Sequence, residues 1–176
     1  GYRKPGDVIS DPGYYSLPGS SHRYRDWKKE GHGIVDLKKS VTISCDTYYY
    51  RLANDMGIAN LHRYLAQFGF GRKSGIDLDG EVSGLLPSPE WKQRRFKQPW
   101  YAGETVITGI GQGYMLATPL QLAVATMAVA NNGTVYRPQL VRAWRDTLSG
   151  RIVENAPKVM DKVELKPEYL ELVKEA

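Results

Sequence analysis

The hydrophobic pattern in the first third of the chain has the period of a helix. Over residues 59–68 the apolar side chains share one helical face, made of Leu61, Tyr64, Leu65 and Phe68. Two shorter helices are predicted before it. One covers residues 37–43, where Asp36 is a good N-cap, and the other covers residues 47–56, which Gly57 ends.

Turn-forming residues dominate two other stretches. Residues 1–33 hold Pro5-Gly6, Asp11-Pro12-Gly13 and Pro18-Gly19, which predict irregular structure with short strands. Residues 72–103 are punctuated by prolines and show no clear period. They are predicted to be loop-like.

The last third of the chain carries a strong helix signal followed by strand patterns. Thr118-Pro119-Leu120-Gln121 combines an N-cap, a proline at the first helical position and a capping glutamine. The helix that follows is apolar almost all round, which is typical of a buried helix. Residues 135–141 and 143–153 are predicted strands, the second with a turn at Ser149-Gly150, and Pro167 begins a last helix.

Composition places the chain among soluble globular domains. It has 176 residues, 41% of them hydrophobic and 24% charged, which allows one domain with a real core. The formal charge of +5 favours an anionic partner without choosing one. The longest apolar run, residues 120–130, is too short to cross a bilayer. The chain opens without methionine or a signal peptide, so we expect it to be a piece of a longer polypeptide.

The tripeptide Ser44-Cys45-Asp46 contains the only cysteine of the chain, which excludes an internal disulfide framework. It falls between the first two predicted helices, where Ser44 and Asp46 are both N-cap candidates. A lone cysteine is usually a small buried hydrophobic residue. Ser44 lacks the Gly-x-Ser-x-Gly setting of a hydrolase nucleophile. It is therefore a nucleophile without an evident base, a proton relay or a helix cap.

A metal site is one use for these side chains. Cys45, His32, Asp26 and Asp11 carry the donor types that zinc prefers, and four of them would close a tetrahedral site. Their spacing matches no compact zinc-finger pattern. Each residue also has an ordinary interpretation: Asp11 starts a turn, Asp26 forms a surface ion pair, His32 lies in a loop and Cys45 fills the core.

Two other motifs give weaker functional signals. Gly109-Ile-Gly-Gln-Gly113 has Tyr114 where a dinucleotide-binding loop needs glycine, so close approach of the backbone to another group is favoured instead. The basic and aromatic run of residues 91–101 suggests nucleic acid. No nucleic-acid-binding motif accompanies it, and we expect no nucleic-acid partner.

Taken together, the motifs resemble the transpeptidase domain of class B penicillin-binding proteins. Within that family they are most similar to the penicillin-binding protein 2 branch, which serves cell elongation in Gram-negative bacteria. The resemblance covers most of residues 1–140 and is carried by an ordered set of motifs: Asp11-Pro-Gly-Tyr-Tyr, Tyr24-Arg-Asp-Trp-Lys-Lys, Gly31-His-Gly, Ser44-Cys-Asp-Thr-Tyr-Tyr-Tyr, Gly75-Ile-Asp-Leu, Pro87-Ser-Pro-Glu-Trp-Lys and Gly109-Ile-Gly-Gln-Gly-Tyr.

This resemblance implies an α+β fold, the mainly helical portion of a serine transpeptidase domain with part of its sheet. It also implies a D,D-transpeptidase that cross-links peptidoglycan stem peptides and is a target of β-lactam antibiotics. The family uses Ser-x-x-Lys, Ser-x-Asn (Asp in this branch) and Lys-Thr/Ser-Gly. Ser44-Cys45-Asp46 matches the second motif. By resemblance Ser44 relays protons, Asp46 holds the lysine and the substrate, and residues 109–113 line the active-site region with backbone.

The first and third motifs are missing. No serine or threonine is followed by lysine three positions later. Lys73-Ser74-Gly75 spells the third motif, but by resemblance it lies in a loop far from the catalytic strand. Residues 1–176 are therefore predicted to be the central part of one transpeptidase domain, and this part alone is predicted to be inactive.

The resemblance also strengthens the metal hypothesis, because some members of this branch carry zinc beside the active site. Asp11, Asp26, His32 and Cys45 match that ligand set residue by residue. The expected partners are a RodA-type glycosyltransferase and cell-shape scaffold proteins, and the expected location is the periplasmic domain of an inner-membrane protein. Two alternatives stay open: a non-catalytic zinc-stabilised binding module and a β-lactamase-like hydrolase.

Overall fold

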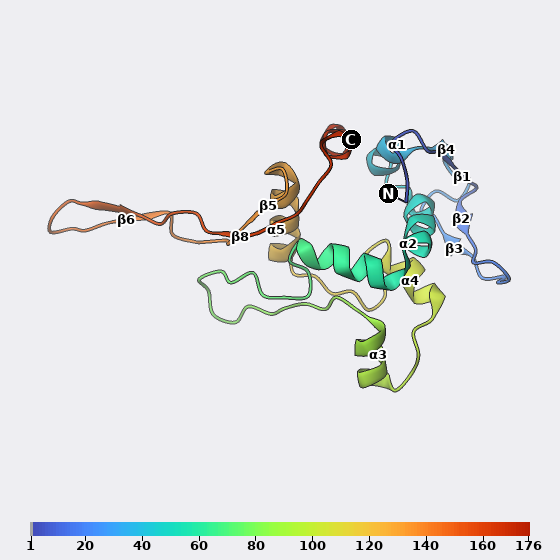
Figure 1. Ribbon diagram of the computed structural model, residues 1–176, viewed down its shortest axis with the longest axis horizontal. Coiled ribbons are helices and arrows are strands. Elements are labelled where there is room, and N and C mark those ends of the chain that lie inside the picture. Colours follow the sequence, from blue (N-terminus) through green and yellow to red (C-terminus); the bar gives the residue numbers. More distant parts are fainter. Residues whose placement is uncertain (1) are drawn as a thin grey trace.

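Helix α2, Asp46–Gln67, is the longest element of the computed structural model, which describes residues 2–176 (Figure 1). Gly57 interrupts it with non-helical backbone angles, φ 71° and ψ 158°. The predicted break at Gly57 is therefore confirmed, and the helices on either side of it join in one kinked element. A glycine adopts positive φ at little steric cost, which explains why the break falls at this residue.

Four short strands and one short helix precede α2. Strand β1, Ile9–Asp11, pairs antiparallel with β4, Gly33–Val35, and β2, Tyr14–Tyr15, pairs with β3, Tyr24–Arg25. The predicted short strands are thus confirmed. Helix α1, Leu37–Thr42, begins where the Asp36 carboxylate accepts a hydrogen bond from the Lys39 N–H. A small apolar cluster of Ile9, Val35, Cys45 and Tyr48 joins these elements to the start of α2.

The prediction that residues 72–103 are loop-like is wrong in part. Helix α3, Pro89–Phe96, begins at Ser88, whose hydroxyl accepts a hydrogen bond from the Trp91 N–H at 3.2 Å. Helix α4, Ala102–Thr108, also starts within this range. Both starts carry ordinary sequence signals, a capping serine before proline at α3 and a capping-box Glu104 at α4. The sequence-based prediction gives the prolines more weight than these capping signals.

Helix α5, Pro119–Ala130, packs its apolar core against β5, Thr134–Tyr136, which pairs with β8, Val159–Lys162. Its predicted capping box is confirmed, since Thr118 and Gln121 exchange hydrogen bonds. The core cluster consists of Phe68, Val124, Ala128, Val135 and Val163. Residues 2–176 do not cover α5 all round, since Leu122 on its other face is 54% exposed within them.

The remaining elements are a hairpin and a terminal helix. Strands β6, Ala143–Arg145, and β7, Ile152–Glu154, pair antiparallel and extend away from the helices (Figure 1). The predicted turn at residues 149–150 joins them. Helix α6, Pro167–Glu175, begins at the predicted proline and returns to the side of α1. In the described part of the chain, no helix combines the length and apolar character needed to cross a membrane.

Candidate active site and metal centre

The tripeptide Ser44-Cys45-Asp46 forms the tight connection between α1 and α2. The Ser44 N–H donates to the Val41 carbonyl at 3.2 Å, and the Cys45 N–H donates to the Ser40 carbonyl at 3.0 Å. Ser44 itself has φ 52°, in the left-handed region that side chains other than glycine rarely adopt. Cys45 is the N-cap residue and Asp46 the first helical residue, so the predicted capping role of Ser44 and Asp46 is wrong.

An open depression of about 340 Å³ lies beside this connection. Its lining comes from α1, the start of α2 and the end of α4: Ser40, Val41, Ser44, Asp46, Tyr49, Gly109 and Ile110. Gly109 fits there because it has no side chain. An added Cβ would lie 2.4 Å from the Cβ of Ala53 and 3.0 Å from the Tyr49 carbonyl oxygen. The predicted close approach of the glycine loop is thus confirmed at Gly109.

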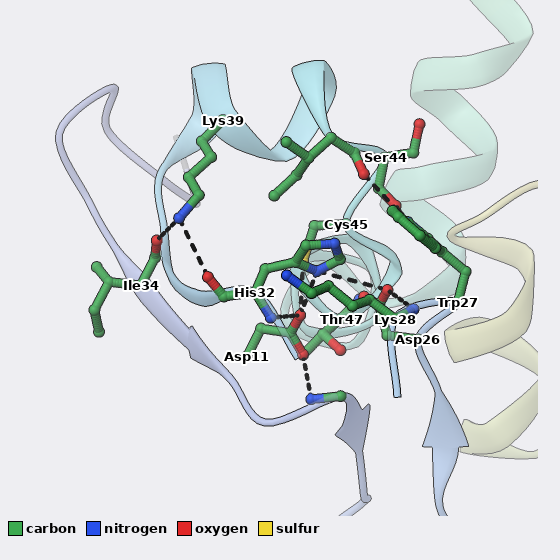
Figure 2. A network of polar contacts seen from close by, with 12 residues as sticks. Asp11, Asp26, Trp27, Lys28, His32, Ile34, Lys39, Ser44, Cys45 and Thr47 are labelled. Atoms are coloured by element: carbon green, nitrogen blue, oxygen red, sulfur yellow. Dashed lines mark hydrogen bonds and ion pairs between the residues drawn. The ribbon is translucent and has the colours of Figure 1, made fainter. Parts of the chain in front are cut away.

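Behind the same connection, four donor side chains converge in a buried cluster (Figure 2). Asp11, Asp26, His32 and Cys45 each offer one ligand atom, and these atoms all lie within 4.8 Å of one another. They come from the end of β1, the residue after β3, the residue before β4 and the N-cap of α2. The fold therefore joins four residues that are spread over 35 positions of the sequence. We call this set the four-residue cluster.

Hydrogen bonds hold the carboxylates of the cluster in place. The Asp11 carboxylate accepts from the N–H groups of Gly13 and His32 at 2.8 and 2.9 Å, and His32 Nδ1 lies 2.7 Å from Asp11 Oδ2. The Asp26 carboxylate accepts from the Thr47 N–H at 3.0 Å, which ties β3 to α2. The Cys45 thiol faces Asp11 Oδ2 at 3.5 Å.

The burial of the cluster tests the ordinary interpretations of its members. Asp26 is 4% exposed, and among the described residues neither Asp26 nor Asp11 forms an ion pair with lysine or arginine. A surface ion pair at Asp26 is therefore wrong. Asp11 does form the predicted turn, through Gly13, and Cys45 does pack in the small apolar cluster. Neither fact accounts for two carboxylates buried beside a thiol and an imidazole.

The electrostatics of the cluster favour a bound cation. Burial, together with the charges of Asp11 and Asp26, raises the pKa of the Cys45 thiol to about 12. Burial opposes ionisation of Asp11, but hydrogen bonds, among them those from the Gly13 and His32 N–H groups, outweigh it and lower the pKa of that carboxyl. Two buried carboxylates are costly without compensating charge. A divalent cation held by this thiol, imidazole and carboxylate set would supply it.

Asp46 lies between the cluster and the depression. Burial, and after it the charge of Asp26, raise the pKa of the Asp46 carboxyl. Ser44 is exposed to solvent and Asp46 is half-buried, so both can meet a group that enters the depression. The structure thus brings the two candidate catalytic residues to one side of Cys45 and the candidate metal ligands to the other.

Trp27 also contacts this site. Its indole N–H donates to the carbonyl oxygens of Ser44 at 2.9 Å and Ile43 at 3.2 Å. Its ring lies edge-on to the His32 ring, with 5.3 Å between centroids. The only sequence signal for this role is its position directly after Asp26.

The Lys73-Ser74-Gly75 motif is held elsewhere. The Glu81 carboxylate accepts hydrogen bonds from the Ser74 N–H at 2.6 Å, the Ser74 hydroxyl and the Gly75 N–H at 3.0 Å. Ser74 is also buried, at 6% exposure. These bonds account for the motif as a structural loop.

Comparison with known proteins identifies the family. A family model described as the penicillin binding protein transpeptidase domain matches residues 1–176. The chain belongs to this family. The resemblance inferred from the ordered motifs is therefore confirmed, as is the predicted mixture of helices with part of a sheet.

Individual relatives refine the placement within the family. The peptidoglycan D,D-transpeptidase MrdA of Acinetobacter baumannii is 56% identical over 150 residues, which cover 85% of this chain and 22% of that protein. The structure of Pseudomonas aeruginosa PBP2 in complex with WCK 5153 has a TM-score of 0.83 at 42% identity, over 97% of this chain and 38% of that one. The chain spans about a fifth of the length of the curated relatives it matches.

A third relative is seen with a partner. Helicobacter pylori PBP2, in its complex with MreC, matches with a TM-score of 0.79 at 32% identity. The match covers 98% of this chain and 29% of that one. The branch predicted from the motifs, penicillin-binding protein 2 of Gram-negative bacteria, is thus the branch that the similar proteins represent.

Proposed function

We propose that residues 1–176 are the central part of the transpeptidase domain of a peptidoglycan D,D-transpeptidase that acts in cell elongation. The observation that carries this proposal is that Ser44, Asp46 and Gly109 line one depression. Membership of the transpeptidase family and the similarity to MrdA support it. In the proposed protein, Ser-x-x-Lys precedes residue 1 and Lys-Thr/Ser-Gly follows residue 176.

The reaction has two acyl-transfer steps. The oxygen of the Ser-x-x-Lys serine attacks the carbonyl carbon of a D-Ala-D-Ala peptide, the peptide bond breaks, and D-alanine leaves with a proton. An amine nitrogen of a neighbouring stem peptide then displaces the serine oxygen, which regains its proton. The Ser44 hydroxyl is exposed beside the depression and can therefore reach a bound substrate. There it passes protons between the lysine and the leaving amine. Asp46 orients the lysine and the substrate by hydrogen bonds.

The four-residue cluster is proposed to hold a structural zinc ion through Asp11, Asp26, His32 and Cys45. The donor set fits zinc, and its buried negative charge has no lysine or arginine partner within the described residues. A zinc ion bound by these residues would supply positive charge and favour the deprotonated Cys45 thiol. The chain's own contribution is to fix the α1–α2 connection, since Cys45 joins the cluster directly to Ser44 and Asp46.

The wider setting follows from the relatives. The complex of a similar protein with MreC supports a cell-shape scaffold partner, and the family supports β-lactams as ligands. A RodA-type glycosyltransferase and a periplasmic location in an inner-membrane protein complete the proposal by analogy with the family. Peptidoglycan stem peptides are the substrates.

Labelling with a fluorescent penicillin tests the function. The longer protein that contains this chain should be acylated, and Ser44→Ala should slow acylation roughly 100-fold, because it removes a proton relay. Ser74→Ala is the matched control. It removes a hydroxyl from the Lys73-Ser74-Gly75 motif, which we place outside the site, and it should leave the rate unchanged.

Two results would contradict the proposal. One is labelling of the isolated 176-residue chain at a serine, since that chain would then contain its own nucleophile. The other is rapid release of the bound penicillin by the longer protein, which would indicate a β-lactamase-like hydrolase.

A further inference from the structure

Ser44 holds a backbone conformation that its own side chain does not explain. A residue with a Cβ at φ 52° is less stable than one in the right-handed or extended region. The carbonyls of Ile43 and Ser44 also lie past the end of α1, where carbonyl groups have no partner within the helix. The N–H groups of Ser44 and Cys45 close the end of α1 on the Val41 and Ser40 carbonyls, so it is the Ile43 and Ser44 carbonyls that are left for contacts from outside α1 and α2.

Trp27 supplies those contacts from a distant part of the sequence. Its indole N–H reaches both carbonyls, at 2.9 Å to Ser44 and 3.2 Å to Ile43 (Figure 2). One donor shared between two successive carbonyls fixes their directions relative to each other. The direction of the Ser44 carbonyl depends on the ψ angle of Ser44. The hydrogen bond from Trp27 therefore restrains the residue that carries the proposed relay hydroxyl.

The backbone of Trp27 is held by the four-residue cluster. The neighbouring Asp26 donates its N–H to the Gly13 carbonyl at 2.9 Å, and its carboxylate accepts from the N–H groups of Lys28 and Thr47. The Trp27 ring lies edge-on to His32. The indole is thus positioned by two cluster residues and contacts the catalytic motif with its single N–H.

The hydrogen bonds of Trp27 distinguish this role from packing alone. Within residues 2–176 its indole is 64% exposed, and its single N–H makes two hydrogen bonds to one loop. We propose that Trp27 is a positioning residue, which fixes the Ser44 backbone and links its orientation to the four-residue cluster. This inference rests on the proposed function of Ser44.

Trp27→Phe tests the hydrogen bond, because phenylalanine keeps an aromatic ring beside His32 and removes the N–H donor. Trp100→Phe is the matched control. The Trp100 indole N–H also donates to the chain, to Thr105 Oγ1 at 2.9 Å, and its ring is more buried than that of Trp27. Both variants are made in the longer protein and followed by the kinetics of acylation with a fluorescent penicillin.

Trp27→Phe should lower the first-order acylation rate about fivefold to tenfold, the usual net effect of one hydrogen bond. The dissociation constant of the preceding complex and the melting temperature should change little. Trp100→Phe should show the reverse pattern, a lower melting temperature with unchanged acylation. The zinc content of Trp27→Phe should equal that of the parent protein.

Three outcomes separate the possible failures. Equal acylation rates for Trp27→Phe and the parent would overturn the positioning role while leaving the proposed function intact. Loss of zinc from Trp27→Phe would also overturn it, because the effect would then belong to the cluster and not to the Ser44 carbonyl. A parent protein that no penicillin acylates would instead overturn the proposed function.

Discussion

The N-terminal and C-terminal parts of this chain have different kinds of interior. The N-terminal part, residues 9–50, has strands of two or three residues around the polar four-residue cluster. The C-terminal part packs α5, β5 and β8 around an apolar core, in which Val135 is 1% exposed. Strands as short as those at the N-terminus form too few ladder bonds to be stable alone.

The comparison teaches where each part derives its stability. Apolar burial stabilises the C-terminal core without further requirements. The N-terminal cluster buries two carboxylates, which need hydrogen bonds or opposite charge to offset the cost of burial. The Ser44-Cys45-Asp46 tripeptide belongs to the second kind of interior, because Cys45 is a member of the cluster and Asp46 follows it directly. We therefore expect metal removal to affect the site more than the apolar core.

The largest expected effect comes from Asp26→Asn with and without a chelator. Asparagine keeps an oxygen to accept from the Thr47 N–H and removes one charge. With zinc present, the variant should lose about 4 kcal/mol of unfolding free energy, because a compensated buried charge cluster is broken. After chelation the variant should be as stable as the parent or more so, since two uncompensated carboxylates become one.

Denaturant unfolding and elemental analysis of zinc measure this difference in the longer protein. If the parent contains no zinc and its melting temperature is unchanged by chelation, the N-terminal interior does not depend on a metal. The distinction between the two parts would then fail.

A smaller effect is expected in the apolar core. Val135→Ala should cost about 2.5 kcal/mol, because it removes buried methyl groups and leaves a cavity. Val159→Ala on the paired strand β8 is the control, since Val159 is 61% exposed and its loss should cost almost nothing. Both changes in unfolding free energy should be the same with and without chelator. A chelator-dependent cost for Val135→Ala would show that the two interiors are coupled.

The smallest of the three effects concerns the contact between α4 and α2 beside the depression. Gly109→Ala should cost about 1.5 kcal/mol in unfolding free energy, because its Cβ would overlap the Cβ of Ala53. Adding Ala53→Gly should recover part of that loss by removing the overlapping atom. Gly6→Ala is the control, because nothing lies within 4 Å of an added Cβ there. A double variant no more stable than Gly109→Ala would show that this contact does not limit the packing.

Sequence patterns predicted most helices, because their ends carry local signals. Asp36, Thr118 with Gln121, and Pro167 mark the starts of α1, α5 and α6, and each was confirmed. The prolines of residues 72–103 predict a loop, although the capping signals at Ser88 and Glu104 mark the starts of α3 and α4. The outward face of α5 was predicted to be buried because composition shows which residues are apolar and not which neighbours cover them.

The candidate site shows the same division between what sequence patterns predict and what only the fold decides. Residue type and family resemblance selected Ser44, Asp46 and the four possible metal ligands, since donor chemistry and motif order are written in the sequence. Only the tertiary structure decided that the four ligand atoms converge, because β-strand pairing and the α1–α2 connection bring positions 11 and 45 together. It also decided the role of Trp27, whose contacts with Ser44 depend on a fold that brings residues 17 positions apart within hydrogen-bond distance.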